Sequence, residues 1–147
     1  MAGGLALAAA PVVGGGPALS EPDDMRQELA KLVGKATVKA GRVKVVMPDL
    51  TENGNSTSLS VSVVSPMTAS DYVKAIHIFS EKNPVPYIAR LGIGAHAGKA
   101  QVATSIRVAD SQTITVLAEM SDGSYWSGTA ATEVTTPACI DDSDRPR

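Results

Sequence analysis

The sequence contains one side chain that could act as a nucleophile without a local catalytic group, the thiol of Cys139. A cysteine thiolate can form a covalent S–S bond with a sulfur compound or with another thiol. Because the chain has no second cysteine, Cys139 cannot form an internal disulfide. It lies eight residues from the C-terminus, and chain ends are often loose. We therefore expect an accessible thiol, which from its position alone is either a covalent carrier or an inert surface group.

Other residue types that perform catalysis or bind metals form no recognisable site. His77 and His96 lie far apart, without cysteine or carboxylate at metal-ligand spacing, so we predict no metal and no cofactor. His77 alternates with apolar residues, which favours a hydrogen-bonded core or interface histidine over a catalytic base. The motifs G-x-S-x-G, G-x-x-x-x-G-K-[ST] and H-E-x-x-H are missing. We therefore predict no catalytic residues and no enzyme activity of its own.

Composition excludes one class of partner and indicates the fold class. The 147 residues include 13 Lys and Arg against 15 Asp and Glu, and no basic stripe is present to neutralise a phosphate backbone. We therefore expect no nucleic-acid partner. Aromatic residues make up 3% of the chain, while Val, Ile, Thr and Ser fill its second half, as is typical of half-buried strands. The length fits one mainly β domain.

Residues 1–20 are interpreted as a signal-peptide-like segment rather than as part of the fold. After Met1 they contain only Ala, Gly, Leu, Val, Pro and Ser, a stretch too short and too rich in Gly and Pro for a stable membrane-spanning helix. Ala18 and Ser20 have the spacing of a cleavage site before Glu21. The usual basic region is missing, which fits a truncated or Tat-type signal. We predict export to the periplasm, with no membrane span after cleavage; the alternative is a buried apolar tail of the domain.

The elements that must position Cys139 follow from the spacing of apolar residues in residues 21–138. In Pro22–Val33 the apolar residues recur every three or four positions, which predicts one N-terminal helix that ends at Gly34. The period then becomes two in seven segments separated by turn-forming residues, which predicts strands. These segments are 43–45, 59–63, 73–79, 87–91, 102–108, 114–120 and 126–134.

Seven short strands at this spacing predict an immunoglobulin-like β-sandwich of two packed sheets. Trp126 is expected to be at least partly buried among apolar neighbours. The Gly-rich stretch LGIGAHAGKA, residues 91–100, is interpreted as a mobile hairpin loop rather than a ligand cradle. Residues 139–147 are expected to form a cysteine-bearing C-terminal tail.

Several stretches of this domain carry a more specific signal. They are Glu52–Gly54, Ser65–Pro84, Ala100–Gly128 and the terminal Cys139. In these stretches the chain resembles the SoxY family, the sulfur-carrier subunits of the periplasmic thiosulfate-oxidising (Sox) system. The resemblance implies an immunoglobulin-like sandwich and a heterodimer with a SoxZ-like small subunit. It also implies that sulfur intermediates are held covalently on Cys139 and presented to sulfur-oxidising partner enzymes.

The chain departs from the family pattern around the cysteine. The family's carrier arm typically ends in G-G-C-G-G, whereas this chain reads TPACI over residues 136–140. Pro137 stiffens the backbone, Ile140 adds bulk, and Asp141 and Asp142 disfavour the thiolate. We therefore expect slower sulfur loading than on a Gly-flanked arm. The alternative is a non-carrier periplasmic binding or assembly module that keeps the sandwich and the subunit interface.

Overall fold

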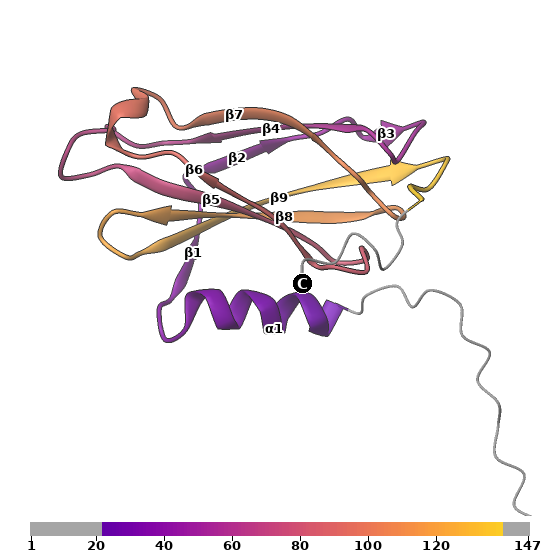
Figure 1. Cartoon of the computed structure of the whole chain (residues 1–147), viewed down its shortest axis with the longest axis horizontal. Helices are drawn as coiled ribbons and strands as arrows, with labels where there is room; N and C mark the ends of the chain where they lie inside the picture. The colour runs from indigo at the N-terminus through magenta and orange to yellow at the C-terminus, as the bar shows by residue number, and fades with distance from the viewer. Residues whose placement is uncertain (1–21, 140–147) are drawn as a thin grey trace, which may run out of the picture.

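The computed structural model describes residues 22–139, as a β-sandwich with one helix packed on it (Figure 1). The signal-peptide-like segment 1–20 lies outside the described residues, and so does all of the tail 139–147 except Cys139. No helix among the described residues is long and apolar enough to cross a membrane. The mainly β fold class predicted from the sequence is confirmed.

The predicted helix is α1 (Pro22–Val33), and Gly34 follows it with a φ of 61°, a left-handed conformation that suits glycine at a helix end. The seven predicted strands are all present. They are β2 (Val43–Val46), β4 (Thr57–Val63), β5 (Val73–Ser80), β6 (Tyr87–Gly92), β7 (Gln101–Ile106), β8 (Gln112–Met120) and β9 (Tyr125–Val134).

Two further strands bring the number in the described part of the chain to nine, so the expected count of about seven was too low. These are β1 (Val38–Ala40) and β3 (Leu50–Thr51), and both pair in parallel with β9. With three and two residues they are too short to show an alternating pattern in the sequence. They form strands because their backbone groups pair with those of β9.

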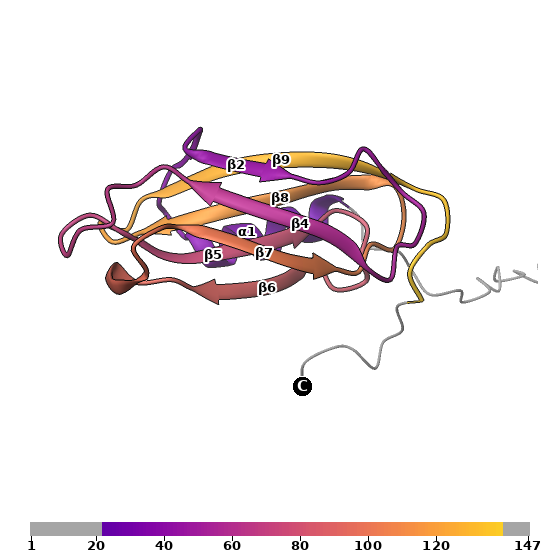
Figure 2. The same cartoon turned by 90° about the horizontal axis from the view of Figure 1, so that it is seen from above.

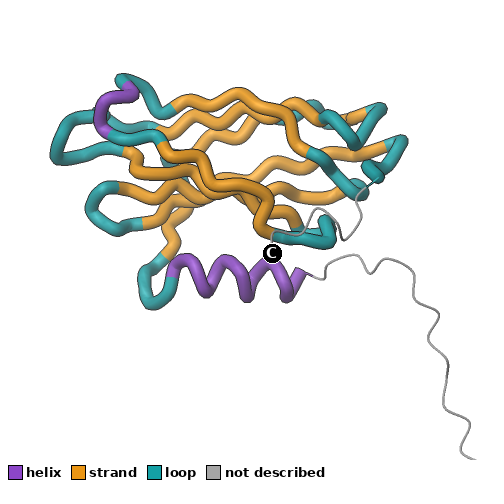
Figure 3. The backbone as a smooth tube through the Cα atoms, viewed as in Figure 1, coloured by secondary structure: helices purple, strands orange, loops and turns teal. Residues whose placement is uncertain are grey.

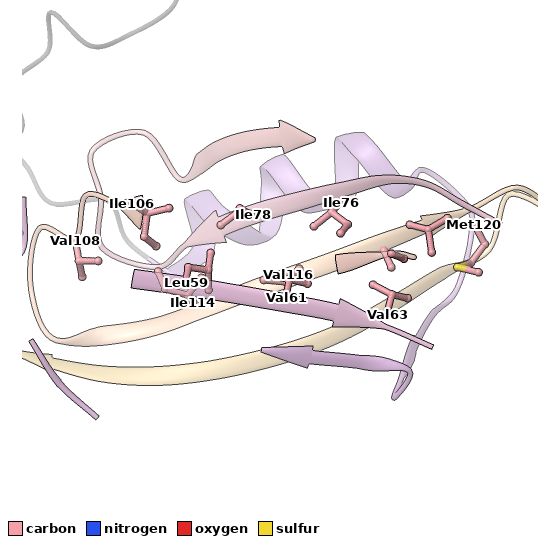
Figure 4. Packing of buried hydrophobic residues seen from close by; sticks show 13 residues of the cluster. Leu59, Val61, Val63, Ile76, Ile78, Ile106, Val108, Ile114, Val116 and Met120 are labelled. Atoms are coloured by element: carbon pink, nitrogen blue, oxygen red, sulfur yellow. The ribbon is translucent and has the colours of Figure 1, made fainter. Parts of the chain in front are cut away.

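The strands form two sheets that pack face to face (Figure 2). The first has the order β1-β9-β8-β5-β6, with β3 also on β9, and the second has the order β2-β4-β7. Burial alternates along β4, as expected for a strand with one face toward a core and the other toward solvent. Side chains from β4, β5 and β8 fill the space between the sheets (Figure 4), among them Leu59, Val61, Ile76, Ile78, Ile114 and Val116.

Part of the outer face of the first sheet is buried as well, because α1 lies across it (Figure 3). Met25 and Val33 of the helix pack with Phe79, Leu117 and Tyr125 of the sheet in a second, smaller core. This explains why β5 is buried at nearly every position instead of alternating. Trp126 is half-buried against the main core, which confirms its predicted burial.

The Gly-rich segment after β6 is not a hairpin loop, and that expectation was wrong. β6 pairs with β5 in the first sheet, whereas β7 pairs with β4 in the second, so the segment crosses from one sheet to the other. It contains a short 3₁₀ turn, Ala95–Ala97, flanked by Gly94 and Gly98 at positive φ. Neighbouring strands in sequence suggest a hairpin, but the sheet to which each strand belongs depends on its distant partners.

Candidate functional site: the segment that holds Cys139

Cys139 is the last described residue, and its thiol is free and exposed. It follows β9, whose C-terminal end lies beside β3 at one end of the sandwich (Figure 1). The predicted accessibility of the thiol is therefore confirmed. The role of Cys139 as a sulfur attachment site stays a prediction.

The backbone leading to Cys139 is attached to the domain by hydrogen bonds. The amide of Gly54 donates to the carbonyl of Thr136 at 2.8 Å, and the amide of Ala138 donates to the carbonyl of Val108 at 3.2 Å. The amide of Val108 donates in turn to the carbonyl of Gly54 at 2.8 Å. We term this set of contacts, with the one from Asn55 described next, the arm clasp; its residues are Gly54, Asn55, Val108 and 136–139.

The last contact of the arm clasp is made by a side chain. The amide of Cys139 donates to Oδ1 of Asn55 at 3.1 Å, across 84 positions of sequence. Asn55 is itself oriented, because its backbone amide and its Nδ2 both donate to Oδ1 of Asn53, at 3.0 and 3.2 Å. With Nδ2 engaged by Asn53, the carboxamide oxygen of Asn55 faces Cys139. The backbone is thus held as far as Cys139, while the thiol remains exposed.

Gly54 is required at the centre of the arm clasp because three backbone atoms lie against its Cα. A Cβ at this position would overlap the carbonyl oxygen of Val108 and would lie 2.8 Å from the nitrogen of Ala138 and 3.1 Å from the carbonyl oxygen of Thr136. Real Cβ atoms essentially never lie within 3.0 Å of such atoms, so a side chain at position 54 would force this backbone to shift. The glycine is therefore needed so that the backbone of the arm can approach closely.

A buried polar network holds the backbone on both sides of Val108, a residue of the arm clasp. Nδ2 of Asn83 donates to the carbonyl of Arg107 at 2.8 Å, and Oδ1 of Asn83 accepts from the amide of Ala109 at 2.9 Å. Nε2 of Gln112 also donates to Oδ1 of Asn83, at 3.1 Å, and Oε1 of Gln112 accepts from the hydroxyl of Ser80. These bonds fix the two residues on either side of Val108, so the network positions the backbone groups that receive the arm.

The two histidines lie in different settings. His96 is exposed in the 3₁₀ turn between β6 and β7. His77 is buried on β5, where Nδ1 lies 2.7 Å from the hydroxyl of Tyr87 and Nε2 lies 2.9 Å from Oε2 of Glu119. The prediction of a hydrogen-bonded core histidine is confirmed. Residues 22–139 contain no group of three His, Cys, Asp or Glu side chains that could hold a metal ion.

Glu119 is the acidic member of the His77 network, and its other carboxylate oxygen lies 3.4 Å from Nζ of Lys74. Burial alone would raise the pKa of its carboxyl group, but hydrogen bonds from His77 and Lys74 outweigh burial and lower the pKa below its usual value of 4.5. Burial raises the pKa of Tyr87 above 10.0, so its hydroxyl stays protonated and can donate to Nδ1 of His77. An ionised carboxylate can only accept, so Nε2 of His77 carries a proton and donates to Oε2 of Glu119.

Stability is expected to fall in acid because of Glu119. A carboxyl group with a lowered folded-state pKa stabilises the fold above its unfolded pKa, and this contribution is lost as the pH falls through the folded value. We therefore expect wild type to exceed Glu119→Gln in urea midpoint at pH 7, and the difference to shrink below about pH 4.5. Urea unfolding of both proteins from pH 7 to pH 3.5 measures this. A difference that stays constant over that range would contradict the assignment.

Sequence reasoning missed most of the residues that hold Cys139. Residues 52–55 and 83–84 are among the turn-forming residues that separate the predicted strands. Their residue types do favour turns, so the pattern carried no sign of what lies across them. The only available signal was that Gly54 and Asn83 fall within the stretches that resemble the SoxY family, whereas Asn55 lies just outside them.

Comparisons with known proteins identify both family and fold. The family model described as sulfur oxidation protein SoxY matches residues 29–139, well over half of the chain. No curated protein sequence gives a significant match. Among solved structures, the sulfur carrier protein SoxY from Chlorobium limicola f thiosulfatophilum is 19% identical, with a TM-score of 0.64 and with 77% of this chain and 97% of that chain covered.

Two other similar structures carry a different description. A putative superoxide reductase from Thermotoga maritima is 16% identical, with a TM-score of 0.58, covering 67% of this chain and 93% of that chain. The superoxide reductase (neelaredoxin) from Ignicoccus hospitalis is 14% identical, with a TM-score of 0.55, covering 79% of this chain and 94% of that chain.

At these identities the solved structures show the fold alone, and a fold that is shared by proteins of different description does not select a function. The family model is more specific, because it matches the sequence itself and extends to the residue that bears the thiol. This chain belongs to the SoxY family of sulfur oxidation proteins.

Proposed function

We propose that this chain is a covalent sulfur carrier of periplasmic thiosulfate oxidation, which holds sulfur intermediates on Cys139 and presents them to partner enzymes. One observation carries the proposal: the SoxY family match ends at Cys139, which is the single cysteine of the chain and is exposed. A carrier needs a nucleophilic sulfur that other proteins can reach. It needs no catalytic group of its own.

Loading would join the Cys139 sulfur to the outer sulfur of thiosulfate. The thiolate and thiosulfate form one S–S bond and release two electrons, so the product is a cysteine S-thiosulfonate. The step therefore requires a redox enzyme as electron acceptor, and this chain contributes the nucleophile alone. A further partner enzyme would act on the loaded group, in accordance with the role of a carrier.

The fold leaves a surface for the expected SoxZ-like subunit of a heterodimer. Helix α1 covers part of the outer face of the first sheet, whereas no described element covers the outer face of the second. That face carries short exposed side chains, which suit close contact with another flat surface. They include Ser58, Ser60, Ala103 and Ser105. Export to the periplasm, with cleavage of residues 1–20, belongs to the same proposal.

Mass spectrometry of protein from its native periplasm tests the carrier proposal. We expect a fraction of the intact protein to carry added sulfur, in the mass of an S-thiosulfonate or a persulfide, and peptide mapping to place it on Cys139. A reductant should remove it, because the bond is an S–S bond. Protein from cells grown without a reduced sulfur source is the control. Native protein that shows no adduct under sulfur-oxidising growth would favour the non-carrier assembly module.

A further inference from the structure

We propose that Asn55 is a positioning residue for Cys139, and that a partner enzyme with a deep cleft can load Cys139 only after the arm clasp opens. This inference rests on the proposed carrier function. It concerns how the thiol is presented, because the structure holds the backbone of Cys139 against the domain while leaving its side chain exposed.

Asn55 makes the outermost contact of the arm clasp. The inner contacts, at Thr136 and Ala138, join backbone groups to backbone groups, whereas Cys139 is held by a side chain on an exposed turn. The orientation of that side chain is set by Asn53, which accepts two hydrogen bonds from Asn55. Removing the carboxamide of Asn55 therefore releases Cys139 without removing the backbone contacts beneath it.

The residues that replace the glycines of the family pattern fit this clasp. Pro137 has no N–H group, and its neighbours supply the bonded carbonyl of Thr136 and the bonded amide of Ala138. Proline and alanine also leave a released arm fewer conformations than glycine would. Both effects favour the state in which the arm is hydrogen-bonded in the arm clasp over the state in which it is released. Residues 136–139 (TPAC) differ from the G-G-C-G-G pattern of the family. The difference is explained if this arm is hydrogen-bonded to the domain.

The attached state separates two kinds of reaction at Cys139. A small thiol reagent reaches the exposed side chain while the arm clasp is closed. A partner enzyme whose reacting group lies in a cleft must take in the backbone on both sides of the cysteine, and the bonds at Ala138 and Cys139 oppose this. Opening the clasp should therefore speed enzymatic loading and leave small-reagent labelling nearly unchanged.

Asn55→Ala tests the proposal, with Ser56→Ala as a matched control in the same turn. Asn55 and Ser56 are both exposed, so both variants are expected to fold. Loss of one hydrogen bond should shift the opening equilibrium by up to about tenfold. We expect amide hydrogen exchange at Cys139 to rise by that factor, labelling by a small disulfide reagent to change less than about twofold, and loading by a thiosulfate-oxidising donor fraction to become faster by several fold.

A second variant, Gly54→Ala, places a methyl group where backbone atoms of the arm lie. It should speed enzymatic loading more than Asn55→Ala does, again with little change in labelling by the small reagent. Unchanged exchange at Cys139 in Asn55→Ala would overturn the positioning role. Equal changes in reagent labelling and enzymatic loading would overturn the gating role, because they would show that the substitution changes the reactivity of the thiol and not the release of the arm. If wild type is not loaded by any donor, the carrier function itself fails, and amide exchange still decides whether Asn55 holds Cys139.

Discussion

Cys139→Ser is expected to abolish sulfur loading, because a serine hydroxyl cannot form an S–S bond and does not ionise near neutral pH. Serine keeps the size of the side chain and leaves the amide of residue 139 free to donate to Asn55. Since the thiol is exposed, the free energy of unfolding should change by less than about 0.5 kcal/mol. Loss of function in a folded variant would then be assigned to the missing sulfur.

The measurement is thiosulfate-dependent electron transfer in a mixture of the chain with a thiosulfate-oxidising donor fraction, together with the intact mass of the chain after reaction. Thr129→Ser, on the exposed face of β9, is a control that alters a side chain without altering the arm clasp. Wild type and the control should both gain a reductant-sensitive adduct. Full electron transfer with Cys139→Ser would refute the carrier proposal and leave the assembly module in its place.

Asn83→Ala is expected to destabilise the domain by about 2–4 kcal/mol. Asn83 is 5% exposed, and its side chain satisfies the carbonyl of Arg107, the amide of Ala109 and Nε2 of Gln112. Alanine would leave these groups without that partner in a site that water reaches poorly, and an unsatisfied buried polar group costs more than a hydrogen bond contributes. The arm clasp should weaken too, because Val108 lies between the two residues that Asn83 holds.

Urea unfolding measures the first effect, as a lower midpoint with an unchanged slope. Amide exchange at Ala138 measures the second, since its acceptor is the carbonyl of Val108. Gln101→Ala, at an exposed position of β7, is the control and should change stability by less than about 0.5 kcal/mol. A midpoint for Asn83→Ala equal to that of the control would show that the network is not needed for stability.

The fold was largely predictable because its main elements have local signatures. The helix Pro22–Val33 and the longer strands carry apolar residues at the period of the element, because at least one face of each packs against a core. The buried setting of His77 was predictable for the same reason. The short strand β3 and the crossing after β6 were not, because both depend on pairing with residues far along the chain.

The candidate site divides in the same way. Sequence alone identified Cys139, since a single thiol near the end of a chain needs no structure to be recognised, and its resemblance to the SoxY family gave that thiol a proposed role. Only the tertiary structure decided how the thiol is held. The contact between Asn55 and Cys139 spans 84 positions, and the need for glycine at position 54 comes from backbone atoms of Val108 and Ala138. Hydrogen bonds between residues far apart in the chain leave no periodic pattern in a sequence. The arm clasp could therefore be identified only from the tertiary structure, which brings these residues together.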